Sequence, residues 1–142
     1  MENLSYRINL TAHDWGDQTG VLPTINKYDE ADFICLKSMG VDVIRLPCNF
    51  DIYSEKPLGI GKIDEDYLKK LDEICDWAEK NQIYLIIDNH NNKTYDKKTY
   101  SASDFTNLQK HLESVWSQIA PRYADRSGTI CNVSLPGTAS KN

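Results

Sequence analysis

Short runs of apolar, often β-branched residues recur at four places along the chain. Each run has the length of a strand, and consecutive apolar positions are typical of strands that are buried on both faces. The runs lie at residues 6–10 (YRINL), 41–46 (VDVIRL), 83–87 (IYLII) and 129–133 (TICNV). The first alternates more than the others and the last is the weakest. The pattern predicts four strands that are buried on both faces of a sheet.

Between these runs, apolar residues recur every three or four positions, which is the period of an amphipathic helix. A helix over about 29–39 ends at Gly40, a residue type that tolerates the left-handed conformation after a helix. A helix over 64–81 begins with three acidic residues, which the positive end of a helix favours. The third helix is capped by Ser103 or Asp104. Its apolar face consists of Phe105, Leu108, Leu112, Val115, Trp116 and Ile119.

The strict alternation of strand and helix predicts the fold class. Short links between these elements are typical of parallel strands joined by right-handed crossovers. The class is therefore α/β, and the parallel sheet is either an open doubly wound sheet or part of a closed barrel. Gly16 and Gly20 stand alone, and the pair Gly59 and Gly61 precedes an acidic helix start. The chain thus lacks a glycine-rich phosphate loop after a strand, which argues against a nucleotide-binding protein.

Composition narrows the classes of partner. The 142 residues, 40% hydrophobic and 26% charged, suit one globular domain. The net charge of -5, with no basic run interleaved with aromatics, argues against nucleic acid. We expect no membrane span, because no apolar stretch approaches the roughly 20 residues that a bilayer requires. The first residues also lack the basic and apolar regions of a signal peptide, so we expect a chain that is cytosolic or already processed.

The four cysteines are predicted to be small buried hydrophobes. Cys35, Cys48, Cys75 and Cys131 lie far apart, each in an apolar segment, which does not fit a disulfide framework or a CxxC metal site.

Candidate functional residues gather where the predicted strands end, because the carboxyl ends of parallel strands meet at one edge of the sheet. Arg45 lies within an apolar strand and should pair with a carboxylate, such as Asp88 on the neighbouring strand, or reach a polar cavity. These two interpretations of Arg45 are compatible. His90 follows the third strand and either donates a hydrogen bond to a ligand hydroxyl or satisfies a loop carbonyl.

Two further hypotheses concern the first strand end. His13 and Trp15 would make a sugar platform, since aromatic faces stack on pyranose rings, although a tryptophan here is equally typical of a barrel plug. A divalent metal would require His13, Asp14, Asp88 and His90 to converge. No two of these four show a diagnostic spacing such as HExxH, so we expect neither a metal nor another cofactor.

Three segments resemble successive blocks of the family 5 glycoside hydrolases: GVDVIRLPCNF, IDEDYLKKLDEICDWAEKNQIYLIIDNHN and WSQIAPRYADRS. The resemblance covers about residues 28–127. It implies a parallel (β/α) barrel of TIM type, of which residues 1–133 form the first half, with about four strands and three helices. Residues 134–142 then form a polar tail outside the barrel.

The same resemblance implies a β-1,4-glucan-type polysaccharide as substrate and partner. In the family, hydrolysis retains configuration: one glutamate protonates the leaving oxygen and another attacks the anomeric carbon. The resemblance implies that Arg45 supports the nucleophile and that His90 contacts the sugar. Asn9 resembles an asparagine near this subsite. The other candidate substrate-binding residues lie at the same strand ends: His13, Trp15, Asn49, Asn89 and Asn91.

Neither catalytic glutamate is where the family would place it. The acid/base of the family follows the fourth strand in an Asn-Glu-Pro motif, and the nucleophile comes from the seventh strand. Here the fourth strand leads to Ser134, Leu135 and Pro136. We therefore expect a hydrolase fragment that is inactive alone; the alternative is a non-catalytic carbohydrate-binding or purely structural half-barrel. Open barrel edges predict a homo-oligomer.

The resemblance ends abruptly near Ser127, which suggests that Gly128 to Asn142 comes from a shifted reading frame, an artificial junction or a diverged end. An intact Asn-Glu-Pro codon run in the frame of Ser127 in the parent gene would contradict a shifted frame.

Overall fold

The computed structural model describes residues 7–9, 28–51, 54–56, 60–89, 99, 101–128 and 130–133. Its elements in chain order are β1 (Arg7–Asn9), α1 (Glu30–Ser38), β2 (Val43–Cys48), β3 (Ser54–Lys56), β4 (Ile60–Ile63), α2 (Glu65–Lys80), β5 (Tyr84–Asn89), α3 (Ala102–Tyr123) and β6 (Ile130–Val133). The four predicted strands and the three predicted helices are all present. The short hairpin of β3 and β4 was not predicted.

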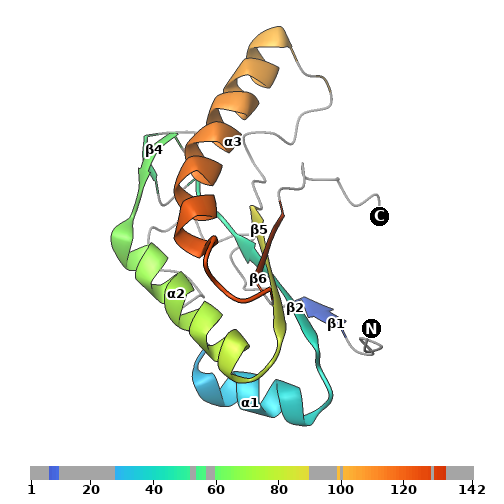
Figure 1. Ribbon diagram of the computed structural model, residues 1–142. Helices are drawn as coiled ribbons and strands as arrows, with labels where there is room; N and C mark the ends of the chain where they lie inside the picture. Colours follow the sequence, from blue (N-terminus) through green and yellow to red (C-terminus); the bar gives the residue numbers. More distant parts are fainter. Residues whose placement is uncertain are drawn as a thin grey trace.

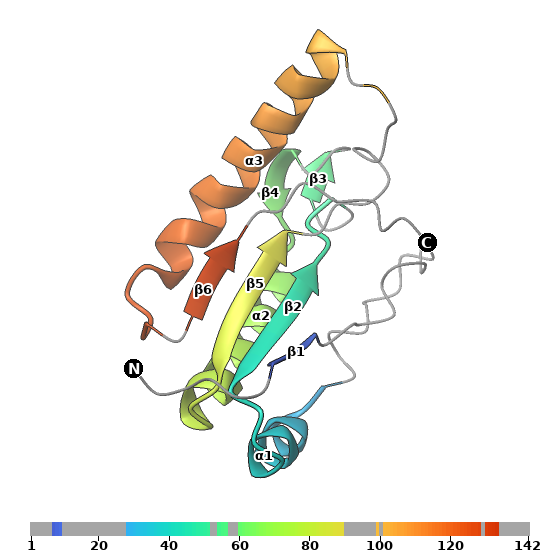
Figure 2. The ribbon, with the colours of Figure 1, turned by 90° about the vertical axis from the view of Figure 1, so that its right-hand side faces the viewer.

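The main sheet is parallel, with strand order β1-β2-β5-β6, as the alternation of strand and helix predicted. Figure 2 shows the four strands side by side with α2 behind them. In Figure 1, α2 and α3 lie on the same side of the sheet, and α1 lies next to α2. The rings of Phe33 in α1 and Trp77 in α2 meet with centroids 5.7 Å apart, which fixes the contact of these two helices. One face of the sheet is therefore the helix-covered face.

Alternation along the strands separates the two faces of the sheet. Ile44, Leu46 and Cys48 of β2 are buried in the core, whereas Arg45 and Pro47 between them are partly exposed. On β5, Tyr84 is 39% exposed although its neighbour Leu85 is fully buried. The prediction that these strands are buried on both faces is met on the helix side and only in part on the other face, where Val43 and Asp88 are buried but Arg45, Pro47 and Tyr84 are not.

The core lies between the sheet and the two longer helices. It is formed by Ile44, Leu46, Leu85 and Ile87 of the sheet, Leu71, Ile74, Cys75 and Ala78 of α2, and Val115 and Ile119 of α3. Cys48 and Cys75 are buried as predicted, and burial raises the pKa of the Cys75 thiol to about 12. Cys35 is exposed, so the prediction of a buried thiol is wrong there, because its side of α1 lies away from the core.

The inward face of α3 differs from the predicted face. Its buried residues step by four: His111, Val115, Ile119 and Tyr123. Phe105 is 61% exposed, so its assignment to the apolar face is wrong. The stripe instead places a polar imidazole in the interior, which apolar periodicity alone does not show.

Helix ends follow local capping chemistry. The cap of α3 is Ser101, two positions before the expected Ser103; the Ser101 hydroxyl accepts the Asp104 N–H at 3.3 Å, and the Asp104 carboxylate accepts the Ser101 N–H at 2.8 Å. The predicted candidate Asp104 is therefore the partner of the cap. Gly40 has a φ of 85°, which confirms the left-handed residue after α1.

The hairpin is fastened to α3 by side chains. Gln118 binds both main-chain groups of the β4 edge: it accepts from the Ile63 N–H at 3.0 Å and donates to the Gly61 carbonyl at 2.9 Å. The Ser114 hydroxyl accepts from the Gly61 N–H at 3.0 Å. Gly61 has a φ of 97°, so a residue with a side chain would be strained there. No helix in the described part of the chain is long and apolar enough to cross a bilayer.

Candidate functional site

Arg45 and Asp88 form the predicted ion pair at the carboxyl end of the sheet. A guanidinium nitrogen of Arg45 lies 2.5 Å from a carboxylate oxygen of Asp88. The strand register aligns Pro47 with Asp88, so the Arg45 side chain reaches along the sheet toward the strand ends. Asp88 is fully buried, and the Arg45 side chain is 28% exposed. A carboxylate this deep in the protein is tolerated because it is paired.

Asn9 lies beside this pair. The register of β1 and β2 aligns the backbone of Asn9 with that of Arg45, and the register of β2 and β5 aligns Arg45 with Ile86, two residues before Asp88. The roles of these residues toward a substrate stay predictions.

Asn89 is the last residue of β5, and its side chain is directed toward α3. Its amide nitrogen lies 2.9 Å from Nε2 of His111, and Asn89 is 3% exposed. Because neighbouring residues of a strand point to opposite faces, Asn89 faces the helices while Asp88 and Arg45 meet on the other face. The predicted contact of Asn89 with substrate remains a prediction.

His111 joins Asn89 to the turn after β2. Its Nδ1 lies 3.3 Å from an oxygen of the Asp51 carboxylate. In the same turn the Asn49 side-chain oxygen accepts the Asp51 N–H at 3.2 Å. Sequence reasoning had not singled out His111 or assigned a role to Asp51. The available signal was a histidine four positions before Val115 on an otherwise apolar helix stripe.

Four other predicted substrate-binding positions, His13, Trp15, His90 and Asn91, lie outside the described residues, as does Asp14 of the metal hypothesis. Within the described ranges, no group of three or more His, Cys, Asp or Glu side chains is placed to hold a metal ion.

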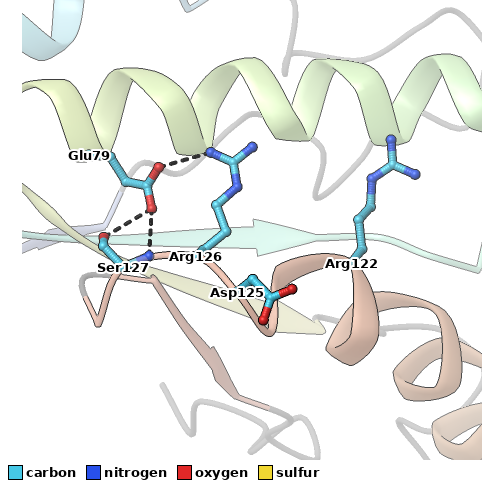
Figure 3. Close-up of a pocket in the computed structure, with 5 residues that line it drawn as sticks. All are labelled: Glu79, Arg122, Asp125, Arg126 and Ser127. Carbon is cyan, nitrogen blue, oxygen red and sulfur yellow. Dashed lines mark hydrogen bonds and ion pairs between the residues drawn. The ribbon is translucent and has the colours of Figure 1, made fainter.

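A hollow of about 540 Å³ lies at the opposite end of the sheet, where α2 and α3 end. It is lined by Glu79, Arg122, Asp125, Arg126 and Ser127 (Figure 3). The Glu79 carboxylate accepts hydrogen bonds from Arg126 at 3.0 Å and from the Ser127 N–H at 3.0 Å. Burial by itself raises the pKa of Glu79, but the hydrogen bonds from Ser127 and Arg126 and the Arg126 charge outweigh it and lower the pKa.

Both arginines of this hollow are bound to carboxylates of α2. A guanidinium nitrogen of Arg122 lies 2.6 Å from a carboxylate oxygen of Asp72 and 3.0 Å from one of Glu65. The guanidinium of Arg126 contacts the carboxylates of Asp76 and Glu79. Because each guanidinium is already engaged, the hollow is best understood as an ion-pair network that holds α3 against α2. It lies at the amino ends of the strands, which in β/α folds usually serve stability.

Residues 7–133 match the family model described as cellulase (glycosyl hydrolase family 5). The match includes β2 and β5 with their ion pair, and α3 with His111. The chain belongs to glycosyl hydrolase family 5. The match extends through residue 133, and β6 pairs with β5 in parallel. The matched range therefore continues past Ser127, where the resemblance was expected to end.

Curated and solved relatives of this family 5 chain are considerably longer. Endoglucanase C of Acetivibrio thermocellus is 31% identical over 97 residues, covering 66% of this chain and 28% of the relative. The chain therefore spans less than a third of that relative's length.

Two solved structures share its fold. The cellulose synthase subunit Z of Clostridioides difficile superposes with a TM-score of 0.71 at 25% identity, over 89% of this chain and 38% of that one. A tri-modular endo-β-1,4-glucanase from Bacillus licheniformis, complexed with cellotetraose, superposes with a TM-score of 0.69 at 23% identity. The superposition covers 94% of this chain and 26% of that one. The parallel sheet and its helices thus correspond to part of a family 5 TIM barrel.

Proposed function

We propose that this chain is the first half of a retaining β-1,4-glucan hydrolase and forms one side of its glucan subsite. Arg45 and His90 supply the supporting contacts, and both catalytic glutamates come from barrel segments other than these 142 residues. The observation that carries the proposal is the Arg45–Asp88 pair at the carboxyl ends of adjacent strands in a family 5 sheet. In barrels of this type, function resides at that end.

The geometry of the pair suits a supporting role. Asp88 is fully buried and holds one guanidinium nitrogen of Arg45. A guanidinium presents five N–H donors in a fixed planar fork. In a complete barrel, the same head group would orient and stabilise the ionised nucleophile carboxylate.

The arrangement of layers supports a half-barrel. The longer helices cover one face of the described sheet, and the opposite face carries Arg45, Asp88 and the partly exposed Tyr84. In a closed barrel, helices lie outside and the other face surrounds the barrel axis. Arg45 would then point toward the axis, where the polysaccharide approaches.

Calorimetric titration with cellotetraose tests the residual subsite. We expect heat of binding for the 142-residue chain and at least a tenfold weaker affinity, about 1.4 kcal/mol, in Arg45→Ala and in His90→Ala. Lys69→Ala is the matched control, because this exposed lysine lies on the outer face of α2 and should leave the heat unchanged. Absence of heat in the unmodified chain, or full heat in Arg45→Ala, would contradict the proposal.

The alternative is a non-catalytic carbohydrate-binding or structural half-barrel that self-associates. The specific observation is the sheet order, in which β1 and β6 are the outer strands, together with 39% exposure of Tyr84 on the face without helices. Self-association through these edges predicts a dimer or a larger homo-oligomer in light scattering. A stable, monodisperse monomer would rule this out.

A further inference from the structure

A buried histidine connects the ends of two neighbouring strands. His111 is fully buried on the inward stripe of α3, among apolar residues such as Val115 and Ile119. Both of its ring nitrogens have polar neighbours: Asp51 lies 3.3 Å from Nδ1, and the Asn89 amide nitrogen lies 2.9 Å from Nε2. A polar group at this depth is tolerated because it is hydrogen-bonded.

The two contacts determine which ring nitrogen carries the proton. An ionised carboxylate only accepts hydrogen bonds, so Nδ1 carries the hydrogen and donates it to Asp51. In the neutral ring, Nε2 is then an acceptor, which matches the donor amide nitrogen of Asn89 opposite it. The two contacts are satisfied together by the tautomer that carries its proton on Nδ1.

The hydrogen bond to His111 determines the orientation of the Asn89 amide. The other end of that amide, its oxygen, is buried and has no hydrogen-bond partner in the described part of the chain. On the other side of the ring, a turn positions Asp51. In this turn the side-chain oxygen of Asn49 accepts a hydrogen bond from the Asp51 N–H at 3.2 Å. The series Asn49, Asp51, His111 and Asn89 thus links the end of β2 to the end of β5.

We infer that His111 is a positioning residue: by holding the Asn89 amide, it fixes the strand end from which His90 continues. The inference rests on the proposed function, in which His90 contacts the glucan. Asn89 is the last residue of β5 and immediately precedes His90 in sequence, so loss of the buried Asn89 hydrogen bond would release the carboxyl end of β5. Arg45 and Asp88 are held separately, on the other face of the sheet.

Two substitutions separate the contacts of His111. His111→Gln places an acceptor oxygen near the position of Nε2 and can keep the Asn89 contact. His111→Asn places an amide near Nδ1, which keeps the donor to Asp51 and loses Asn89. We expect the affinity for cellotetraose to fall about tenfold in His111→Asn and less than about threefold in His111→Gln, as for loss of one buried hydrogen bond. Equal losses in both variants would overturn the inference.

Nitrogen NMR of the unmodified chain tests the same inference without any sugar. We expect Nδ1 of His111 in the protonated range and Nε2 in the unprotonated range. The Asn89 side-chain amide protons should exchange slowly with solvent in the unmodified chain and in His111→Gln, and faster in His111→Asn. A protonated Nε2, or an unchanged Asn89 amide in His111→Asn, would contradict positioning by His111. If cellotetraose does not bind, the proposed function fails, and these spectra still decide the role of His111.

Discussion

Replacing Arg45 by methionine should lower the free energy of unfolding by about 3 kcal/mol, because Asp88 would remain fully buried without its guanidinium partner. Methionine keeps much of the apolar stem, so the loss reports mainly on the charge. The usual cost of removing one partner from a buried pair is about 3–5 kcal/mol, and 28% exposure of the Arg45 side chain places this pair at the lower end. Urea unfolding followed by circular dichroism measures the change.

The double variant Arg45→Met with Asp88→Leu is the matched control for this prediction. Removing both charges leaves no isolated carboxylate in the interior, so the double variant should regain most of the lost stability. A loss below about 1 kcal/mol in Arg45→Met would be typical of a solvent-exposed pair and would contradict a buried one.

The order of the main strands and helices could be predicted because each has its own apolar period. The strand ends were less accurate: β2 and β5 continue to Cys48 and Asn89, beyond the expected ends. Polar Asp88 and Asn89 resemble loop residues in sequence, yet each has a partner in the fold, Arg45 and His111 respectively. The hairpin of β3 and β4 was not predicted because β4 is held by side chains of α3, more than 50 residues later in the sequence.

The candidate site also has a part that could be predicted from the sequence and a part that could not. Arg45 and Asp88 could be paired from sequence, since an arginine within an apolar strand needs a carboxylate nearby. The contact of His111 with Asp51 and Asn89 could not, because nothing in the apolar period identifies which polar groups meet between a sheet and a helix. Phe105 shows the reverse case: its spacing fits the apolar face, but the helix presents His111 to the core and leaves Phe105 exposed.

The purified chain should release no reducing sugar from carboxymethyl cellulose. Retaining hydrolysis needs two carboxyl groups about 5 Å apart, one to protonate the leaving oxygen and one to attack. At the described strand ends, the carboxylate of Asp88 is bound to Arg45 and that of Asp51 contacts His111, so neither is placed for these tasks. The segment after β6 begins Ser134, Leu135, Pro136, where the family resemblance implies an Asn-Glu-Pro acid/base.

Proton transfer by a placed acid or base contributes roughly 10²–10⁴-fold to a rate, and the nucleophile is missing as well. The expected turnover is therefore indistinguishable from that of buffer, even in a sample whose circular dichroism shows folded protein.

Reducing-sugar release by this folded 142-residue chain is the most direct test of the central claim, a family 5 half-barrel without its own catalytic glutamates. The account predicts no release above the buffer control at any protein concentration. Release that rises in proportion to the chain, and that disappears when the same sample is heat-denatured, would contradict it.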